Sequence, residues 1–90
     1  MNVLQTQMFR KQIKKLHKNQ KELLDESVKK IIEDSFLGEM KKGDLSDIRV
    51  YKFKMVKQLT LLAYRFYENK LQLILLTLGT YENFYRDLKR

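Results

Sequence analysis

The chain has 90 residues, enough for one domain with one modest core, and 43% of them are hydrophobic, which is typical of a globular protein. It contains no cysteine, which excludes disulfides, thiolate metal sites and cysteine nucleophiles. Its 19 Lys and Arg residues against 11 Asp and Glu give a net charge of +8, which implies an anionic partner such as nucleic acid, a membrane surface or an acidic protein.

The N-terminus and the apolar runs of the chain indicate the compartment in which the protein is expected to function. The N-terminus lacks the basic stretch and apolar stretch of a secretory signal, and the longest apolar run, near 71–78, is far too short to span a bilayer. The single histidine and the scattered acids do not have the spacing of metal ligands. We therefore expect one cytoplasmic domain over residues 1–90, with no metal, no cofactor and no membrane association.

The first half of the chain predicts two helices. Residues 7–18 carry apolar side chains at i, i+4 and i+7, with lysines on the opposite side. Asn19 and Glu22 have the spacing of a capping-box variant that opens a second helix, and Gly38 ends it. Because the link between the helices is short, they are expected to form an antiparallel helical hairpin.

The second half predicts strands. Residues 38–47 are polar and predict a loop, after which the pattern changes to alternating and continuous apolar residues. Glu68 and Asn69 form a two-residue hairpin link, since Asn tolerates a positive φ. The expected strands cover residues 48–55, 59–67 and 70–78, with an edge strand at 2–5 and a short helix at 81–88. The fold class is thus α+β in the order β-α-α-β-β-β-α, an antiparallel sheet with the helical hairpin packed on one face.

The strand at 48–55 alternates lysines with large apolar residues. Because successive side chains of a strand point to opposite faces, Tyr51 and Phe53 can face a core while Lys52 and Lys54 share the other side, about 7 Å apart. Two neighbouring ammonium groups on a rigid sheet favour a phosphate-binding surface. A solvated polar face of a half-buried strand explains the same pattern, so the alternation alone leaves both interpretations open.

Several segments, in this order, resemble the RelE/ParE superfamily of toxins from bacterial type II toxin–antitoxin modules. The likeness runs over nearly the whole chain. Each segment alone is weakly specific, but their order and spacing together are a strong signal. The segments are Lys42-Gly43-Asp44-Leu45, Arg49-Val50-Tyr51-Lys52-Phe53-Lys54, Leu62-Ala63-Tyr64 and Leu78-Gly79-Thr80-Tyr81-Glu82-Asn83-Phe84-Tyr85.

For RelE-like members, the resemblance implies a ribosome-dependent endonuclease that cuts mRNA through attack of a ribose 2′-OH on its own 3′-phosphate. It also implies an acidic cognate antitoxin as partner, besides the ribosome and mRNA. The residues at the matching catalytic positions are Lys52, Lys54, Tyr85 and Tyr81, and those expected to bind RNA around them are Arg49, Lys57, Arg86 and Lys89.

Two positions depart from the family pattern. The family commonly places Arg on the strand after the lysines, where this chain has Thr60-Leu61-Leu62, and it commonly places Arg or His at Tyr81. A tyrosine with a pKa near 10 is a poor base at neutral pH, but it can donate a proton or stack on a base.

Other functions and simpler roles remain open. The ParE branch inhibits DNA gyrase without this catalytic set, and a plain nucleic-acid-binding module is a third hypothesis, although no helix-turn-helix, RRM or KH signature is present. Tyr81 and Tyr85, four residues apart, also fit packing aromatics on a helix. His17 lies at the rim of the first helix's apolar stripe, far in sequence from the other candidate groups.

Overall fold

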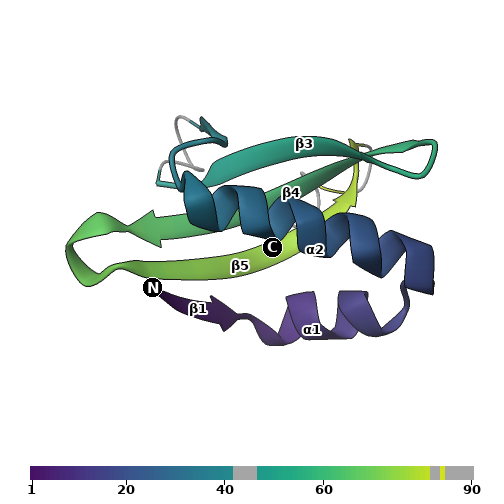
Figure 1. Cartoon of the computed structure of the whole chain (residues 1–90), viewed down its shortest axis with the longest axis horizontal. Helices are drawn as coiled ribbons and strands as arrows, with labels where there is room; N and C mark the ends of the chain where they lie inside the picture. Colours follow the sequence, from purple (N-terminus) through teal and green to yellow (C-terminus); the bar gives the residue numbers. More distant parts are fainter. Residues whose placement is uncertain (42–46, 82–83, 85–90) are drawn as a thin grey trace.

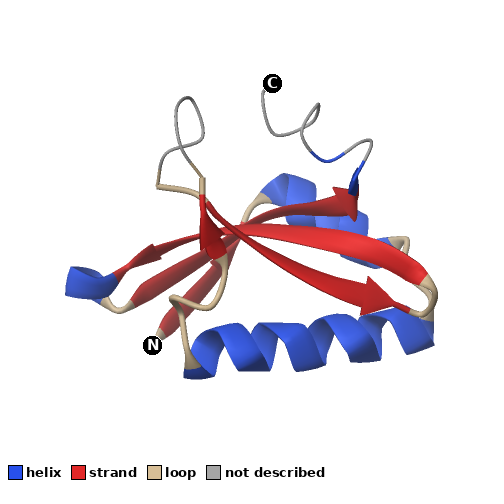
Figure 2. Ribbon diagram, turned by 90° about the horizontal axis from the view of Figure 1, so that it is seen from above, coloured by secondary structure: helices blue, strands red, loops and turns tan. Residues whose placement is uncertain are grey.

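The computed structural model describes residues 1–41, 47–81 and 84, and it shows a five-stranded sheet in the order β1-β5-β4-β3-β2. α2 lies along one face of this sheet, and α1 lies beside β1 and β5 (Figures 1 and 2). The predicted α+β class, with two helices before the main strands, is confirmed. The elements are β1 (Asn2–Gln5), α1 (Gln7–Lys14), α2 (Lys18–Glu33), β2 (Glu39–Met40), β3 (Arg49–Met55), β4 (Gln58–Tyr67), the 3₁₀ helix η2 (Glu68–Lys70) and β5 (Gln72–Thr80).

The sheet is antiparallel from β2 to β5, as expected, whereas the edge strand β1 pairs parallel with β5. A parallel edge strand on an otherwise antiparallel sheet is a common arrangement. β2 is a two-residue strand inside the region that the sequence predicts as a loop, and it pairs with the start of β3. The sheet is therefore one strand wider than expected at the β3 edge.

β1 pairs only with the first part of β5. Two side chains, Thr6 just before α1 and Gln12 within α1, bond to backbone groups of the remaining part. The Thr6 hydroxyl accepts from Phe9 N at 3.1 Å, which caps α1, and donates to Leu76 O at 2.6 Å. Gln12 Oε1 accepts from Leu78 N at 2.9 Å. Because unpaired edge groups are costly when buried, these side chains fix α1 against the β5 edge.

The helix boundaries differ from the predicted ones. α1 ends at Lys14, and α2 begins at Lys18 with His17 as its N-cap, so the prediction of Asn19 as the cap is wrong. The Gln20 side chain, three residues after His17, accepts from His17 N at 2.8 Å and fixes that start. His17 is exposed at this helix end and takes no part in the apolar stripe.

The link between β4 and β5 is also longer than predicted. The two-residue link at Glu68-Asn69 is wrong, because η2 extends to Lys70 and Leu71 then adopts the left-handed conformation with φ 48°. The positive φ thus falls on an exposed leucine instead of on Asn69. In the turn between β3 and β4, the β-branched Val56 also has a positive φ, 62°.

The sheet has a hydrophobic cluster on each face. On the helix-covered face, β3 contributes Tyr51, Phe53 and Met55, as the alternation predicts, and these pack with residues of both helices, including Phe9, Leu24 and Ile31. The other face, which we call the open face, carries a smaller cluster made of Ile48, Val50, Leu61, Ala63 and Phe84. Phe84 is 1% exposed, so the chain after β5 is anchored on the open face.

Tyr64 connects the sheet to the chain that follows α2. Its buried hydroxyl donates to Ser35 O at 3.0 Å and accepts from Gly38 N at 2.8 Å. A Cβ at Gly38 would lie 2.8 Å from Tyr64 ring and hydroxyl atoms, so glycine is required there for close approach. Burial raises the pKa of Tyr64 above its usual value of 10.0, although the Gly38 hydrogen bond and the Arg49 charge oppose the rise.

We expect Tyr64→Phe to lower the free energy of unfolding by about 1–3 kcal/mol, because it leaves the buried Gly38 N–H and Ser35 carbonyl without their partner. The folded-state pKa of Tyr64 is raised, so its contribution is complete below pH 10 and is lost as the pH rises through the folded value. Urea unfolding on both sides of pH 10 measures both effects. Tyr67→Phe, at a half-buried tyrosine, is the matched control, and equal losses in the two variants would contradict the assignment.

Candidate functional site

The lysine pair of β3 lies on the open face. Lys52 is in register with Leu61 of β4, and Lys54 with Leu59. Both lysines are exposed, while their strand neighbours Tyr51 and Phe53 face the helices. Among the residues that the structure describes, no ion pair joins either lysine to an acid. The alternation-based prediction of two exposed cations on one face is confirmed.

Tyr81 and Lys57 lie at the same end of the sheet as the lysine pair. β4 and β5 pair Leu61 with Gly79 and Thr60 with Thr80, so Tyr81 follows the strand end that lies level with Lys54. Tyr81 is 61% exposed, and Lys57 is exposed in the turn between β3 and β4. The structure thus gathers three of the predicted cations and one of the predicted tyrosines at one end of the sheet.

Arg49 is placed elsewhere. It lies on the helix-covered face, where its Nη1 donates to Phe36 O at 3.2 Å and to Gly38 O at 2.9 Å. Its guanidinium carbon is 4.9 Å from the centre of the Phe36 ring. These contacts tie β3 to the chain after α2, and they separate Arg49 from the lysine pair by the thickness of the sheet.

Three predicted residues, Tyr85, Arg86 and Lys89, lie outside the described residues. Of the predicted helix at 81–88, the structure describes Tyr81 and Phe84, both in helical conformation. Phe84 is buried against the open-face cluster, which fixes the direction in which the chain leaves Tyr81.

The resemblance implies an arginine in the stretch where this chain has Thr60-Leu61-Leu62, and of these three residues Leu61 shares the open face with Lys52. Leu61, directly across from Lys52, is 0% exposed and packs with Ala63 and Phe84. A charged side chain there would have to be buried without a partner, which is costly. The packing of the open face around Leu61 therefore disfavours a cation at this position.

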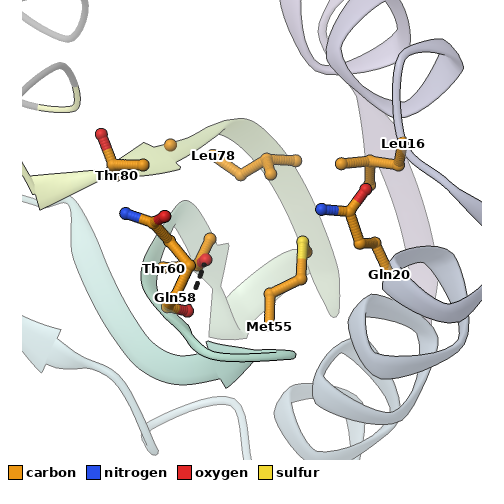
Figure 3. A pocket seen from close by; sticks show the side chains of 8 residues that line it. Leu16, Gln20, Met55, Gln58, Thr60, Leu78 and Thr80 are labelled. Carbon is orange, nitrogen blue, oxygen red and sulfur yellow. Dashed lines mark hydrogen bonds between the residues drawn. The ribbon is translucent and has the colours of Figure 1, made fainter.

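A pocket of about 240 Å³ lies on the helix-covered side of the same sheet end (Figure 3). Met55 and Leu78 form part of its apolar floor, and the Thr60 hydroxyl at its wall donates to Gln58 O at 3.2 Å. Because Lys52 and Lys54 point to the open face, the backbone of the sheet separates them from this pocket. The lining consists of Leu16, Gln20, Met55, Gln58, Thr60, Leu78, Gly79 and Thr80.

Sequence reasoning missed one cation of the open face, Arg65. It alternates with Tyr64 on β4 and therefore shares the face of Lys52 and Lys54. The signal was present in the strand alternation around Tyr64-Arg65-Phe66, but only the structure shows the surroundings of the guanidinium.

Two absences hold for the part of the chain that the structure describes. No group of three His, Asp or Glu side chains has the arrangement of a metal site in residues 1–41, 47–81 and 84. In those same residues, no helix has the length and apolarity required to cross a bilayer.

Three solved structures share the fold. The isolated E. coli RelE toxin superposes with a TM-score of 0.69 at 20% identity, covering 99% of this chain and 96% of that one. The intact E. coli RelBE toxin–antitoxin complex gives 0.71 at 19% identity over 88% and 94% of the two chains. The YoeB/ParE toxin from Agrobacterium tumefaciens gives 0.72 at 14% identity over 90% and 99%.

A search of curated protein sequences finds no match to the chain. The family model described as the ParE-like toxin of type II bacterial toxin–antitoxin systems matches residues 3–89. That match covers nearly the whole chain. The chain therefore belongs to the RelE/ParE superfamily of type II toxin–antitoxin toxins.

Proposed function

We propose that this toxin inhibits translation as a ribosome-dependent mRNA endonuclease. The observation that carries the proposal is the Lys52–Lys54 pair, two exposed cations on a rigid strand with no acid paired to them among the described residues. A phosphate held there would lie against the open face, level with Tyr81. The chemistry requires such a concentration of positive charge, because the phosphorane gains negative charge as it forms.

In the proposed reaction, the 2′-hydroxyl of a ribose releases its proton to water and its oxygen attacks the phosphorus of its own 3′-phosphate. The bond to the 5′-oxygen of the next nucleotide breaks, that oxygen takes up a proton, and a 2′,3′-cyclic phosphate is left. The ammonium groups of Lys52 and Lys54 stabilise the charge on the phosphorane oxygens. Tyr81 or Tyr85 donates a proton to the leaving oxygen or stacks on a neighbouring base. Lys57, Arg86 and Lys89 contribute attraction to the RNA backbone. Arg49 is not included in this surface, because its guanidinium lies on the other face of the sheet, where Nη1 donates to the Phe36 and Gly38 carbonyls.

The alternative is a toxin that inhibits DNA gyrase without cleaving RNA. The buried Leu61, which excludes a further cation beside Lys52, is the observation that favours it. One experiment separates the two functions: the purified toxin is added to a cell-free translation reaction, mRNA ends are mapped, and gyrase supercoiling is measured in parallel. The endonuclease proposal requires new mRNA ends within translated codons and unchanged supercoiling, while the reverse result would establish the gyrase target.

We also propose a cognate acidic antitoxin as partner, in line with the RelBE complex that shares this fold. A net charge of +8 favours an acidic partner. An exposed apolar patch at the end of α2 offers it a place to bind, since Phe36 is 53% exposed and lies under the Arg49 guanidinium. An amphipathic helix with acids at its rim would cover this patch and pair with Arg49. The patch consists of Ile32, Phe36, Leu37 and Met40.

We expect the association rate with the product of the neighbouring acidic reading frame to fall as salt is raised, because charge steers the encounter. Phe36→Ala should mainly raise the dissociation rate, by roughly fivefold or more, since truncating a central aromatic anchor costs above about 1 kcal/mol. Stopped-flow or surface-based kinetics at two salt concentrations measure both rates. Leu71→Ala, at an exposed leucine near the β4–β5 link, is the control. Unchanged dissociation of the Phe36 variant would move the interface elsewhere.

A further inference from the structure

Arg65 is a partly buried cation with no protein partner in the described chain. Its Nε is buried and makes no hydrogen bond. Neither hydrogen bonds nor ion pairs of its other guanidinium nitrogens are found within the described residues. Buried donors in folded proteins are almost always paired, and a donor that stays unpaired away from water destabilises the fold.

The described residues around Arg65 are mostly apolar and offer its guanidinium no hydrogen-bond acceptor. Its neighbours on β4 are Tyr64 and Phe66, which face the helices, and its register partner on β5 is Ile74. Two residues back on its own face is Ala63, part of the apolar cluster under Phe84. Glu39 also belongs to the open face by its register with Val50, but its carboxylate lies 3.9 Å from Lys41 Nζ. The guanidinium of Arg65 thus lies among apolar side chains and makes no hydrogen bond through Nε. For the stability of the fold, a methionine or leucine would serve equally well at this position.

Among the described residues, the open face therefore carries cations without an ion pair on both sides of its apolar cluster. Lys52 is level with Leu61, and Arg65 lies four residues further along β4, about 13 Å away along the strand. The apolar cluster of the open face, which includes Ala63 and Phe84, lies between them. Both cations belong to the same surface, and among the described residues the acid that shares this face, Glu39, lies beside Lys41.

We propose that Arg65 binds a backbone phosphate of the RNA substrate, displaced along the strand from the phosphate held by Lys52 and Lys54. The proposal rests on the endonuclease function proposed above and deepens it by adding a second phosphate contact. The planar guanidinium offers a fork of donors that matches the oxygens of a phosphate, and no hydrogen bond within the described residues occupies these donors. Arg65 is a binding residue in this assignment, remote from the reacting atoms.

The test measures the binding of a labelled single-stranded 2′-O-methyl oligoribonucleotide, which has no 2′-OH to react, by fluorescence anisotropy from about 50 to about 200 mM salt. Arg65→Gln is expected to weaken binding roughly tenfold and to reduce the salt slope by about 0.7, the value for one phosphate contact on a single strand. Arg65→Lys should recover the salt slope, because it restores the charge, and only part of the affinity, because it lacks the fork.

Lys29→Gln removes one positive charge from the exposed surface of α2 and is the matched control. It should change affinity and slope far less than Arg65→Gln. If the two variants behave alike, Arg65 contributes only general charge and the proposal is overturned, which leaves a carboxylate of a partner protein as the better occupant. Lys52→Ala, measured in the same assay, separates this failure from that of the function itself: a loss with Lys52→Ala and none with Arg65→Gln overturns only the inference.

Thermal unfolding supplies an independent readout. Because the fold gives Arg65 Nε no partner, Arg65→Met should leave the melting temperature unchanged or raise it by a few degrees. A fall of more than about 5 °C would show that Arg65 stabilises the fold through its own contacts, and this too would overturn the assignment.

Discussion

Lys52→Ala and Lys54→Ala are each expected to reduce mRNA cleavage about 10²–10³-fold while leaving the fold intact. Removing one cation from a phosphorane site costs about 2–4 kcal/mol of transition-state stabilisation. Both side chains are exposed and make no ion pair within the described residues, so their loss removes little from the native structure. Mapped mRNA ends in a cell-free translation reaction, together with circular dichroism, measure the two effects separately.

The controls for these variants are chosen on charge. Lys70→Ala removes an exposed lysine that lies 5.6 Å above the Tyr67 ring, at the opposite end of β4 from the lysine pair. It should cut mRNA at nearly the parental rate. Lys52→Arg keeps the positive charge in the same place and should retain part of the activity. If both β3 alanine variants cleave as well as the parent, the open face is not the catalytic surface.

Local chain chemistry was enough to predict much of this fold. The alternation of Tyr51 to Lys54 correctly placed the aromatics in the core and the lysines on the other face, since a strand leaves no other arrangement once one face is buried. The start of α2 was missed because residues 17–22 are all polar, and the hydrogen bond from His17 N to the Gln20 side chain, which marks His17 as the N-cap, is visible only in the structure. Leu71 was missed because a leucine at positive φ is against its intrinsic preference and is imposed by the β4–β5 connection.

The candidate site could be predicted only in part. Lys52 and Lys54 follow from spacing, but the burial of Leu61 depends on Phe84, which follows β5 in the chain and packs on the open face. The lack of a partner for Arg65 Nε depends on the side chains around it and is visible only in the structure. Arg49 is the converse case. It belongs to the lysine strand β3, but its side chain lies on the opposite face and donates to the Phe36 and Gly38 carbonyls.

The packing of Phe84 connects stability to the site, and it leads to the second large effect. Phe84 is 1% exposed and packs against Leu61 and Ala63, three residues after Tyr81. Phe84→Ala would open a cavity on the open face or release its cover, with an expected loss of about 3–5 kcal/mol in the free energy of unfolding. For a domain of this size, that loss lowers the melting temperature by at least about 10 °C.

The same substitution should also lower cleavage at temperatures where the variant is still folded. Tyr81 is placed at the sheet end by β5 on one side and by the Phe84 anchor on the other, so losing the anchor frees the tyrosine from its position beside the lysine pair. Urea unfolding and mRNA-end mapping on one preparation measure both losses, with Leu71→Ala, at a 58% exposed leucine, as the control that should change neither. Phe84→Leu keeps most of the buried area and should recover stability and cleavage together. If it recovers stability while cleavage stays low, the aromatic ring itself acts at the site and not merely as an anchor.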